Sequence, residues 1–323
     1  MQCGLKKGRM TAVSITGISM RAIQIVLVPI GICVSLVFGG CTNLDAPRLK
    51  PQSRRVVVNF TNQGLSALDM PMGAFRIPNS EVIVSGYQQG GVNLGLIHGV
   101  VTVAPTSSGG FKEKAAVKSS EQALEISLTT LAPPVLSTLI ESSKFSERYA
   151  LTPDASAPVL SIGGGVVLMF VSDTLLRPYV VLDAALRGPH GSGFWSMRYV
   201  ASIGAPRVLT GPDGWASDGG APFQAIVSSE LQRALAVILT DVSSPLVRDR
   251  NSKTTVQGYF PYIKGRFQVI GYLLGEDADS IYFVPDVPTT SSLHGIQIMD
   301  KPITVFRAAT ADDPRMRSLY VPD

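Results

Sequence analysis

The longest helical pattern in the chain covers residues 223–239. Apolar residues recur there at intervals of three and four, which places them on one face of a helix. That face consists of Phe223, Val227, Leu231, Ala234 and Ile238. Glu230, Gln232 and Arg233 lie between them, and we expect these three side chains to remain on the polar side. The pattern therefore predicts a strongly amphipathic helix.

A second helical pattern runs from Lys112 to Leu131. It is followed directly by Pro133 and Pro134. Proline lacks the N–H that a helix needs and clashes with the preceding turn. We therefore expect the two prolines to interrupt this helix, and a further short helix to cover 135–140.

Apolar runs predict strands in much of the remaining chain. They cover 56–60, 81–85, 166–171, 179–186, 194–200, 256–260, 266–274, 280–284, 296–298 and 303–306. The run 166–171 is apolar throughout, which is expected of a central strand covered on both faces. The segment 245–253 is rich in proline and charge and indicates a boundary between two groups of strands.

These patterns predict an α+β fold. We expect a small sheet packed by two or more helices over residues 55–243, followed by a small C-terminal antiparallel β module at 254–308. Residues 309–323 are predicted to form a loose tail.

One long segment of the chain contains no charged residue. The thirty residues between Glu81 and Lys112 carry no formal charge, and Gly91, Gly95 and Gly99 recur there at every fourth position. On a helix these glycines would form a ridge for close packing of another backbone. A glycine-rich turn region with a strand at 100–103 is the alternative, and it is slightly favoured because glycine destabilises ordinary helices.

The first 40 residues have the pattern of a secretory signal peptide. A basic start with Lys6, Lys7 and Arg9 precedes Arg21 and an uncharged apolar run of about 17 residues. Met20 would also begin a complete signal, so both starts remain open. An uncleaved membrane anchor is the alternative, but the run is shorter than the ~20 residues that a span needs.

The apolar run ends in Phe38-Gly39-Gly40-Cys41. This ending resembles the lipobox of bacterial lipoproteins, although the usual motif prefers Leu at position 38. The resemblance implies that Cys41 becomes the first residue of the mature chain and carries the lipid anchor. Residues 41–54 are then a tether. Thr42 stands where an Asp retains enterobacterial lipoproteins at the inner membrane, so the analogy favours the outer membrane, with the domain in the periplasm.

Removal of this leader changes the charge of the protein. The whole chain has 28 basic and 24 acidic residues, and the leader contains four basic residues and no acidic one. The mature chain is therefore balanced, which removes the electrostatic argument for a nucleic-acid partner. Cys3 and Cys33 leave with the leader, so the mature chain has neither a disulfide nor a cysteine metal site.

A search for catalytic motifs finds little. His98, His190 and His294 are isolated from one another, and no metal-binding spacing is present. His190 precedes Gly191-Ser192-Gly193, but the frame is wrong for the G-x-S-x-G motif, so a solvated turn is favoured. We predict no catalytic, cofactor-binding or metal-binding residue, and no cofactor.

Three further patterns also have structural explanations. Gly163-Gly164-Gly165 precedes a strand, so it lacks the geometry of a phosphate-binding loop. Glu276, Asp277 and Asp279 lack the spacing of a calcium loop and indicate a charged turn. Trp195 and Tyr199 lie on one side of their strand and are expected in the core.

The order of elements from Lys112 to Val242 resembles the domain of ABC-transport auxiliary lipoproteins and of relatives of the curli secretion-channel lipoprotein. The resemblance rests on the pattern from Tyr179 through Asp183 to Trp195 and on the helix at 223–239, and it transfers no functional residue. It implies a non-enzymatic accessory or assembly component of envelope machinery, with an envelope protein or a second copy as partner. A periplasmic hydrolase or ligand-binding lipoprotein with a dispersed site is the alternative.

Overall fold

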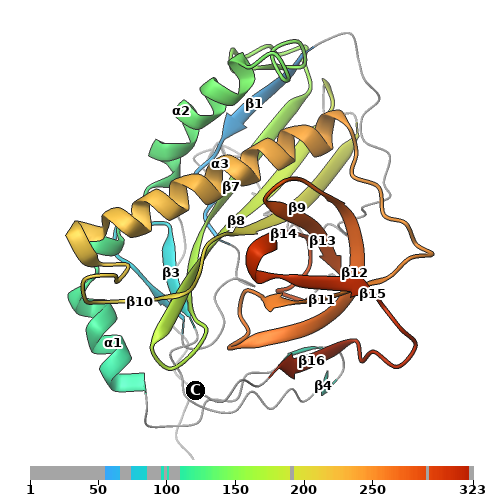
Figure 1. Cartoon of the computed structure of the whole chain (residues 1–323). Coiled ribbons are helices and arrows are strands. Elements are labelled where there is room, and N and C mark those ends of the chain that lie inside the picture. Colours follow the sequence, from blue (N-terminus) through green and yellow to red (C-terminus); the bar gives the residue numbers. More distant parts are fainter. Residues whose placement is uncertain are drawn as a thin grey trace, which may run out of the picture. The chain divides into compact units, whose positions relative to one another are not determined.

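Figure 1 shows the fold in a computed structural model of the chain. The described residues are 55–65, 74–85, 96–97, 100–101, 110–189, 193–288 and 291–319. The chain divides into two units, 1–39 and 40–323, and every described residue belongs to the second. Cys41 and the tether therefore lie outside the described residues, as do Gly91, Gly95 and Gly99.

Fourteen strands of the described residues form one mixed sheet. The strands of its first half, here called the helix-covered half, are β1 (Val56–Phe60), β2 (Phe75–Arg76), β3 (Val82–Ser85), β6 (Tyr149–Ala150), β7 (Val159–Phe170), β8 (Leu175–Arg187), β9 (Phe194–Ser202) and β10 (Arg207–Val208). The strands of the C-terminal half are β11 (Thr254–Tyr259), β12 (Arg266–Glu276), β13 (Ser280–Pro285), β14 (Ile296–Asp300), β15 (Val305–Ala308) and β16 (Met316–Leu319).

The two halves join through a single pair of strands. The order along the sheet is β15-β11-β12-β13-β14-β9-β8-β7-β1-β6, so β9 and β14 are neighbours. They pair in parallel, with Ile296 opposite Tyr199 and Met299 opposite Ser202. The strands β7, β8 and β9 form an antiparallel meander in the helix-covered half, and β11, β12, β13 and β14 form another in the C-terminal half.

The predicted fold class is wrong in its description of the sheet. We expected a small sheet and a small separate β module at 254–308, whereas the strands of both regions belong to one large sheet of fourteen strands. Five of the six C-terminal strands lie where apolar runs predicted them. The predicted loose tail at 309–323 is wrong in part, because its residues Met316–Leu319 form β16 and pair antiparallel with β12. Sequence patterns locate strands but do not specify which strands pair, because pairing between β9 and β14 depends on contacts about a hundred residues apart.

The helices of the described residues are α1 (Gly110–Ser119), α2 (Leu128–Glu141) and α3 (Ala221–Ser243), and the 3-10 turns are η2 (Gln122–Leu124), η4 (Ser217–Gly220) and η5 (Lys301–Ile303). Figure 1 shows α2 and α3 lying across one face of the helix-covered half. The predicted apolar face of α3 is confirmed, because Phe223, Val227, Leu231, Ala234 and Ile238 are all fully buried.

The two prolines do not interrupt their helix, contrary to the prediction. Pro133 and Pro134 lie inside α2, on its exposed side. The opposite side of this helix buries Leu128, Ala132, Leu136 and Ile140. Burial of four apolar side chains at helical spacing outweighs the loss of two backbone hydrogen bonds, which costs about 3 kcal/mol or more for each proline. The predicted helix at 112–131 ends earlier instead, with α1 at Ser119.

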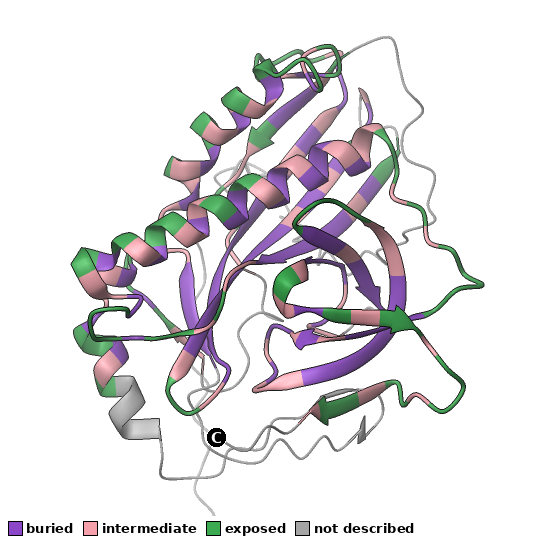
Figure 2. Ribbon diagram, viewed as in Figure 1, coloured by how far each residue is buried: buried purple, intermediate pink, exposed green. Residues whose placement is uncertain are grey.

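The core is continuous beneath these helices. Figure 2 shows buried residues along the sides of α2 and α3 that face the sheet and along the central strands. β7 is buried on both faces from Gly163 to Phe170, as predicted for a central strand. Trp195 and Tyr199 are buried in this core, which confirms their assignment.

Within the uncharged segment, the described residues beyond β3 and before α1 form one small element. β4 (Leu96–Ile97) and β5 (Val100–Val101) pair antiparallel as a two-stranded sheet. These four residues are therefore extended rather than helical, which favours the turn-and-strand alternative over a helical glycine ridge.

Candidate functional site

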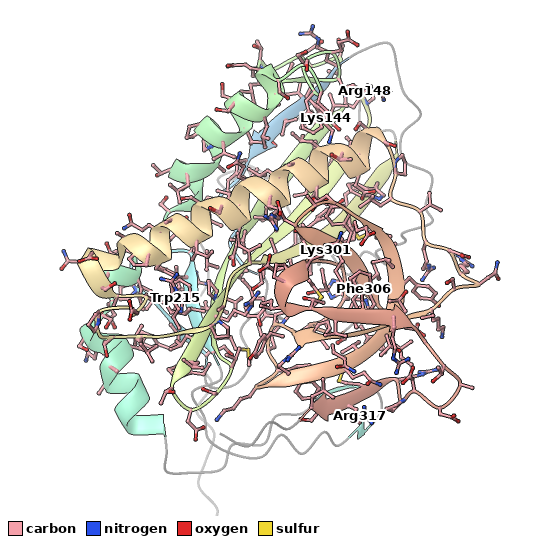
Figure 3. All side chains as sticks on the ribbon, viewed as in Figure 1. Lys144, Arg148, Trp215, Lys301, Phe306 and Arg317 are labelled. Carbon is pink, nitrogen blue, oxygen red and sulfur yellow. The ribbon has the colours of Figure 1, made fainter. Side chains whose placement is uncertain are left out.

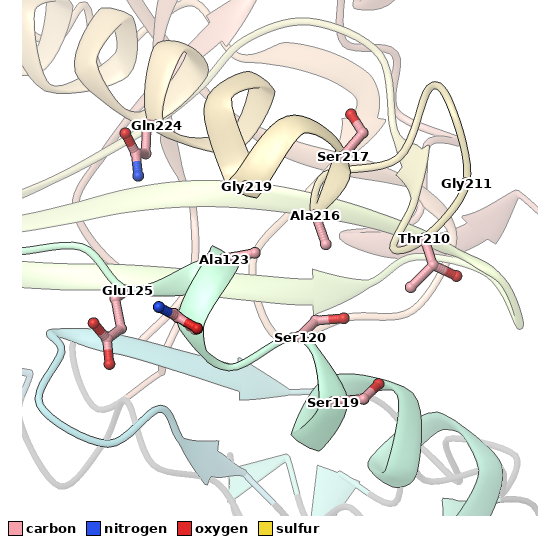
Figure 4. A pocket seen from close by; sticks show the side chains of 11 residues that line it. Ser119, Ser120, Ala123, Glu125, Thr210, Gly211, Ala216, Ser217, Gly219 and Gln224 are labelled. Carbon is pink, nitrogen blue, oxygen red and sulfur yellow. The ribbon is translucent and has the colours of Figure 1, made fainter.

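A hollow of about 760 Å³ lies beside the N-terminus of α3. Figure 4 shows its two walls, one from the end of α1 and η2, the other from the loop 210–219 and the first turn of α3. The lining residues are Ser119, Ser120, Gln122, Ala123, Glu125, Thr210, Gly211, Ala216, Ser217, Gly219 and Gln224.

The two walls touch where η4 crosses η2. Gly220 has φ 89°, and a Cβ atom at this position would lie 1.8 Å from the carbonyl oxygen of Ala123. Only glycine permits both the left-handed backbone and this close approach. Asp218 and Gly219 are also left-handed, at φ 48° and 66°, so three successive residues turn the chain sharply into α3.

The loop under the hollow is held by a buried tryptophan. Trp215 is 1% exposed, and its indole N–H donates to the carbonyl oxygen of Leu176 in β8 at 2.8 Å. Its ring packs edge-on against Phe223 of α3. The guanidinium of Arg207 lies over the indole, 5.0 Å from the centre of the ring. The indole therefore connects the wall of the hollow to both the sheet and the helix. Trp215 is labelled in Figure 3.

The chemistry of the hollow is that of neutral hydrogen bonding. Its lining supplies serine and threonine hydroxyls and two glutamine amides, and Glu125 is its single ionisable side chain. Among the described residues that line it there is no cation to bind a phosphate or to polarise a carbonyl group, and no histidine to pair with Glu125 as an acid–base couple. These lining groups can donate and accept hydrogen bonds.

A second polar cluster is buried where β8, β9 and α3 meet. Arg177 is 2% exposed, and its Nε donates to the Ser202 hydroxyl oxygen at 2.6 Å, while its Nη1 donates to the carbonyl oxygen of Gly204. The Ser202 hydroxyl donates in turn to the carbonyl oxygen of Pro178 at 2.9 Å. The Gly204 N–H donates to Asp300 at the end of β14, so the cluster also reaches the C-terminal half.

Glu230 of α3 belongs to this cluster. It is fully buried, and its Oε1 accepts a hydrogen bond from the Ile203 N–H at 3.0 Å. Burial raises the pKa of Glu230 well above its ordinary value, and the Ile203 N–H and the nearby Arg177 charge offset only part of this rise. Burial therefore favours the neutral form of this carboxyl group relative to an exposed glutamate. We expected this side chain on the polar side of the helix, which is wrong.

The position of Glu230 had a signal in the sequence. It follows Phe223 by seven residues and therefore shares the apolar face of α3. Trp215 was missed for a different reason, because a single tryptophan beside a glycine-rich turn has no periodicity to indicate burial.

Several residues that the sequence singled out lie outside the described part of the chain. This holds for Cys41, the one predicted site residue, and for His98 and His190, which the sequence search examined and did not assign to a site. His294 is described and half-buried, and its Nδ1 lies 2.5 Å from the Ser291 carbonyl oxygen. Among the described residues there is no group of three or more metal-ligating side chains.

The acidic turn after β12 is satisfied by neighbouring protein groups. Asp277 accepts from the N–H groups of Asp279 and Ser280, at 2.9 and 2.7 Å, and from the Tyr282 hydroxyl. Lys301 forms an ion pair with Glu276 at 3.0 Å. The charged-turn interpretation is therefore confirmed. The glycines Gly163 to Gly165 likewise lie inside β7, where a Cβ at Gly165 would lie 2.6 Å from the Glu81 carbonyl oxygen.

One helical segment of the described residues, Gln122–Glu141, would be long and apolar enough to cross a membrane by length and composition alone. It contains the stripe of α2 that packs into the core. Core helices of soluble proteins satisfy the same test, so this segment is weak support for a membrane span.

No protein-family model matches the chain, and no curated protein matches its sequence. Among solved structures, the crystal structure of protein XCC0632 from Xanthomonas campestris, described as family-model DUF330, is similar over 61% of this chain and 86% of that chain. The sequence identity is 14% and the TM-score is 0.26. At this TM-score the likeness carries no argument about fold or function.

Proposed function

We propose that this chain is a lipid-anchored lipoprotein of the outer membrane, with its domain in the periplasm. We further propose that the domain acts by binding, as an accessory or assembly component of envelope machinery. The observation that carries the anchor is the ending Phe38-Gly39-Gly40-Cys41 after an uncharged apolar run. Thirteen residues, 42–54, separate Cys41 from Arg55, the residue before β1, which is a suitable length for a tether.

The chemistry of the hollow beside α3 supports binding over catalysis. Its lining offers hydroxyl and amide groups around the single carboxylate of Glu125. Such a surface suits an uncharged polar segment of a partner protein, whose backbone amides need hydrogen-bond partners when they leave water. A periplasmic hydrolase is the second candidate, and it would need acid–base groups from beyond this lining.

The anchor is tested by the mass of the mature N-terminus. We expect mass spectrometry of the membrane-extracted protein to show a chain that begins at Cys41 and carries two or three acyl chains. Cys41→Ser should release the protein from the membrane fraction. Cys33→Ser is the matched control, because residue 33 leaves with the leader. An unmodified chain that begins upstream of Cys41 would refute the proposal.

The binding role is tested by crosslinking in cells. A photoreactive side chain in place of Gln224, at the rim of the hollow, should capture one discrete partner protein. The same side chain in place of Gln232 is the control, because Gln232 is equally exposed on α3 but does not line the hollow. Equal capture at both positions would contradict a binding site at the hollow.

A further inference from the structure

The strands β1, β6, β7, β8 and β9 begin or finish side by side at one end of the helix-covered half. Tyr149 of β6 lies opposite Val56 of β1, and Val159 of β7 lies opposite Val57. The same register continues across the sheet, with Val159 opposite Arg187 of β8 and Arg187 opposite Phe194 of β9. We call this the β1 end of the sheet, and it comprises Arg55, Lys144, Arg148, Arg187 and Phe194.

The β1 end carries four exposed cations from separate parts of the chain. Arg55 precedes β1, and Arg148 precedes β6, where the Val56 N–H donates to its carbonyl oxygen at 2.8 Å. Arg187 ends β8. Lys144 lies in the preceding loop, and Figure 3 shows it beside Arg148 at the C-terminal end of α3.

Two of these cations, Lys144 and Arg148, donate to uncharged groups. The Lys144 ammonium donates to the Thr240 hydroxyl at 3.1 Å, and the Arg148 guanidinium donates to the Ser243 carbonyl oxygen at 3.5 Å. The Arg187 guanidinium lies 5.7 Å from the centre of the Phe194 ring. Neither Lys144 nor Arg148 forms an ion pair with a described residue, so both keep their charge available to a partner.

Exposed apolar side chains accompany the cations. Among the described residues five large apolar side chains are exposed, and two of them lie at or beside this end, namely Phe194 at 48% and Leu151 at 41%. Leu151 directly follows β6, which pairs with β1. Cations beside exposed aromatic and aliphatic groups are the composition of surfaces that contact lipid headgroups.

The charge of this end is positive only by a small margin within the described residues. Glu147 and Asp154 lie in the same loops as the cations. Basic residues that adjoin a lipid anchor attract anionic lipids by about 1 kcal/mol each, or about fivefold in binding.

The tether limits how far the β1 end can lie from the membrane. Residues 42–54 separate Cys41 from Arg55, and a fully extended segment of this length spans at most about 50 Å. If Cys41 carries the lipid, as proposed above, Arg55 and the start of β1 stay within this distance of the bilayer. The basic and apolar side chains of the β1 end are therefore within reach of a membrane surface.

We propose that the β1 end of the sheet is a second membrane contact, which lies against an anionic phospholipid surface. The inference rests on the proposed lipid anchor, because the anchor supplies the high local lipid concentration that a weak surface contact needs. Lys144 and Arg148 would pair with phosphate groups, and Phe194 would enter the headgroup region. This contact would orient the domain, with the hollow beside α3 at the other end of that helix.

The contact is tested without the anchor, by cosedimentation of the mature chain bearing Cys41→Ser with lipid vesicles. We expect binding to vesicles of phosphatidylglycerol and phosphatidylcholine in equal parts, and little binding to pure phosphatidylcholine. Raising the salt to about 0.5 M should abolish it, because the Debye length then falls to a few ångströms.

Charge reversal locates the contact. Lys144→Glu with Arg148→Glu should weaken binding to the anionic vesicles by at least about 25-fold. Arg76→Glu with Lys118→Glu is the matched control, since both residues are exposed, change the net charge equally and lie away from the β1 end. Phe194→Ser should weaken binding by a smaller factor and leave the salt dependence unchanged. Circular dichroism checks that each variant is folded.

Three outcomes would overturn the proposal: no binding of the Cys41→Ser chain to anionic vesicles, equal binding to both vesicle types, or equal losses in the two charge-reversed pairs. A failure of the lipid anchor is distinguishable from these. An unmodified Cys41 in cells would refute the anchor by mass spectrometry, whereas vesicle binding by the Cys41→Ser chain reports only on the β1 end.

Discussion

Glu230 and Asp313 are carboxylic acids in the two halves of the same sheet, and their surroundings differ in opposite ways. Glu230 is enclosed between α3 and the sheet, where the Ile203 N–H donates to one of its oxygens. Asp313 lies near the C-terminal edge. Its oxygens accept two hydrogen bonds from Arg307 at 2.7 Å, one from Thr255 at 3.0 Å and one from Gln268 at 3.2 Å.

The pKa values of the two groups move apart as a result. Burial raises the pKa of Glu230, whereas the hydrogen bonds from Arg307 hold the pKa of Asp313 well below its ordinary value. Around Glu230 the helix-covered half excludes water, which disfavours a charged carboxylate. In the C-terminal half the charged Asp313 accepts hydrogen bonds that connect the loop after β15 to β11 and β12. The comparison teaches that one sheet is stabilised by two different means.

The largest expected effect is that of Phe267→Ala, which tests whether the two halves unfold together. Phe267 is 2% exposed in the core of the C-terminal half, and Phe267→Ala should cost about 3–5 kcal/mol. Trp195 and Trp215, the two tryptophans of the chain, both lie in the helix-covered half. Because β9 and β14 join the halves, we expect tryptophan fluorescence to show the full loss in urea unfolding. An unchanged fluorescence transition would show that the halves unfold independently.

The next effect concerns the wall of the hollow in the helix-covered half. Gly220→Ala should destabilise the protein by about 2–5 kcal/mol, because it combines a left-handed backbone with a clash against Ala123. Gly219→Ala is the control, since Gly219 is also left-handed at φ 66° but has open space around it. It should cost only about 1–2 kcal/mol in thermal or urea unfolding. Similar losses in both variants would show that the close approach at Gly220 is relaxed.

Glu230→Gln sharpens the comparison through its pH dependence. The folded pKa lies above the unfolded value, so native Glu230 favours folding below about pH 4.5 and this advantage is lost as the pH rises toward the folded pKa. Stability of the variant relative to the native protein should therefore increase with pH, by up to about 1.4 kcal/mol per pH unit. Urea unfolding at pH 4, 6 and 8 measures this trend. A constant difference would indicate an unshifted pKa.

Asp313→Asn should have the smallest effect and the opposite pH dependence. The folded pKa lies below the ordinary value of 3.8, so the stabilising contribution is complete above that value and is lost as the pH falls through the folded pKa. The variant should therefore have a slightly lower melting temperature at pH 7, with the difference shrinking in acid. Arg307→Gln should reproduce this pattern, because it removes the other partner. Opposite trends in the two variants would contradict the pairing.

The sequence predicted the local elements well, because each has its own periodicity. The strands β1, β7, β8 and β9 and the buried face of α3 follow directly from apolar spacing. The uninterrupted α2 was missed because the rule for proline considers only the backbone. Here the apolar stripe from Leu128 to Ile140 outweighs it.

The sheet and the hollow were beyond prediction for a different reason. The pairing of β9 with β14 and the contact of Gly220 with Ala123 both join residues about a hundred positions apart. Spacing along the chain contains no signal for such contacts. Glu230 is the exception, since its seven-residue distance from Phe223 indicated the buried face before any contact was known.

The parallel pairing of β9 with β14 also sets an order of events during synthesis and export. When β8 and β9 have paired, the other edge of β9 still lacks its partner, because Ile296 to Met299 follow about a hundred residues later. An open strand edge invites pairing with other chains. A chain that folded as it emerged would therefore expose this edge until β14 arrived, and closure of such a distant contact is intrinsically slow. The arrival of β14 thus determines how long the growing protein remains prone to aggregation.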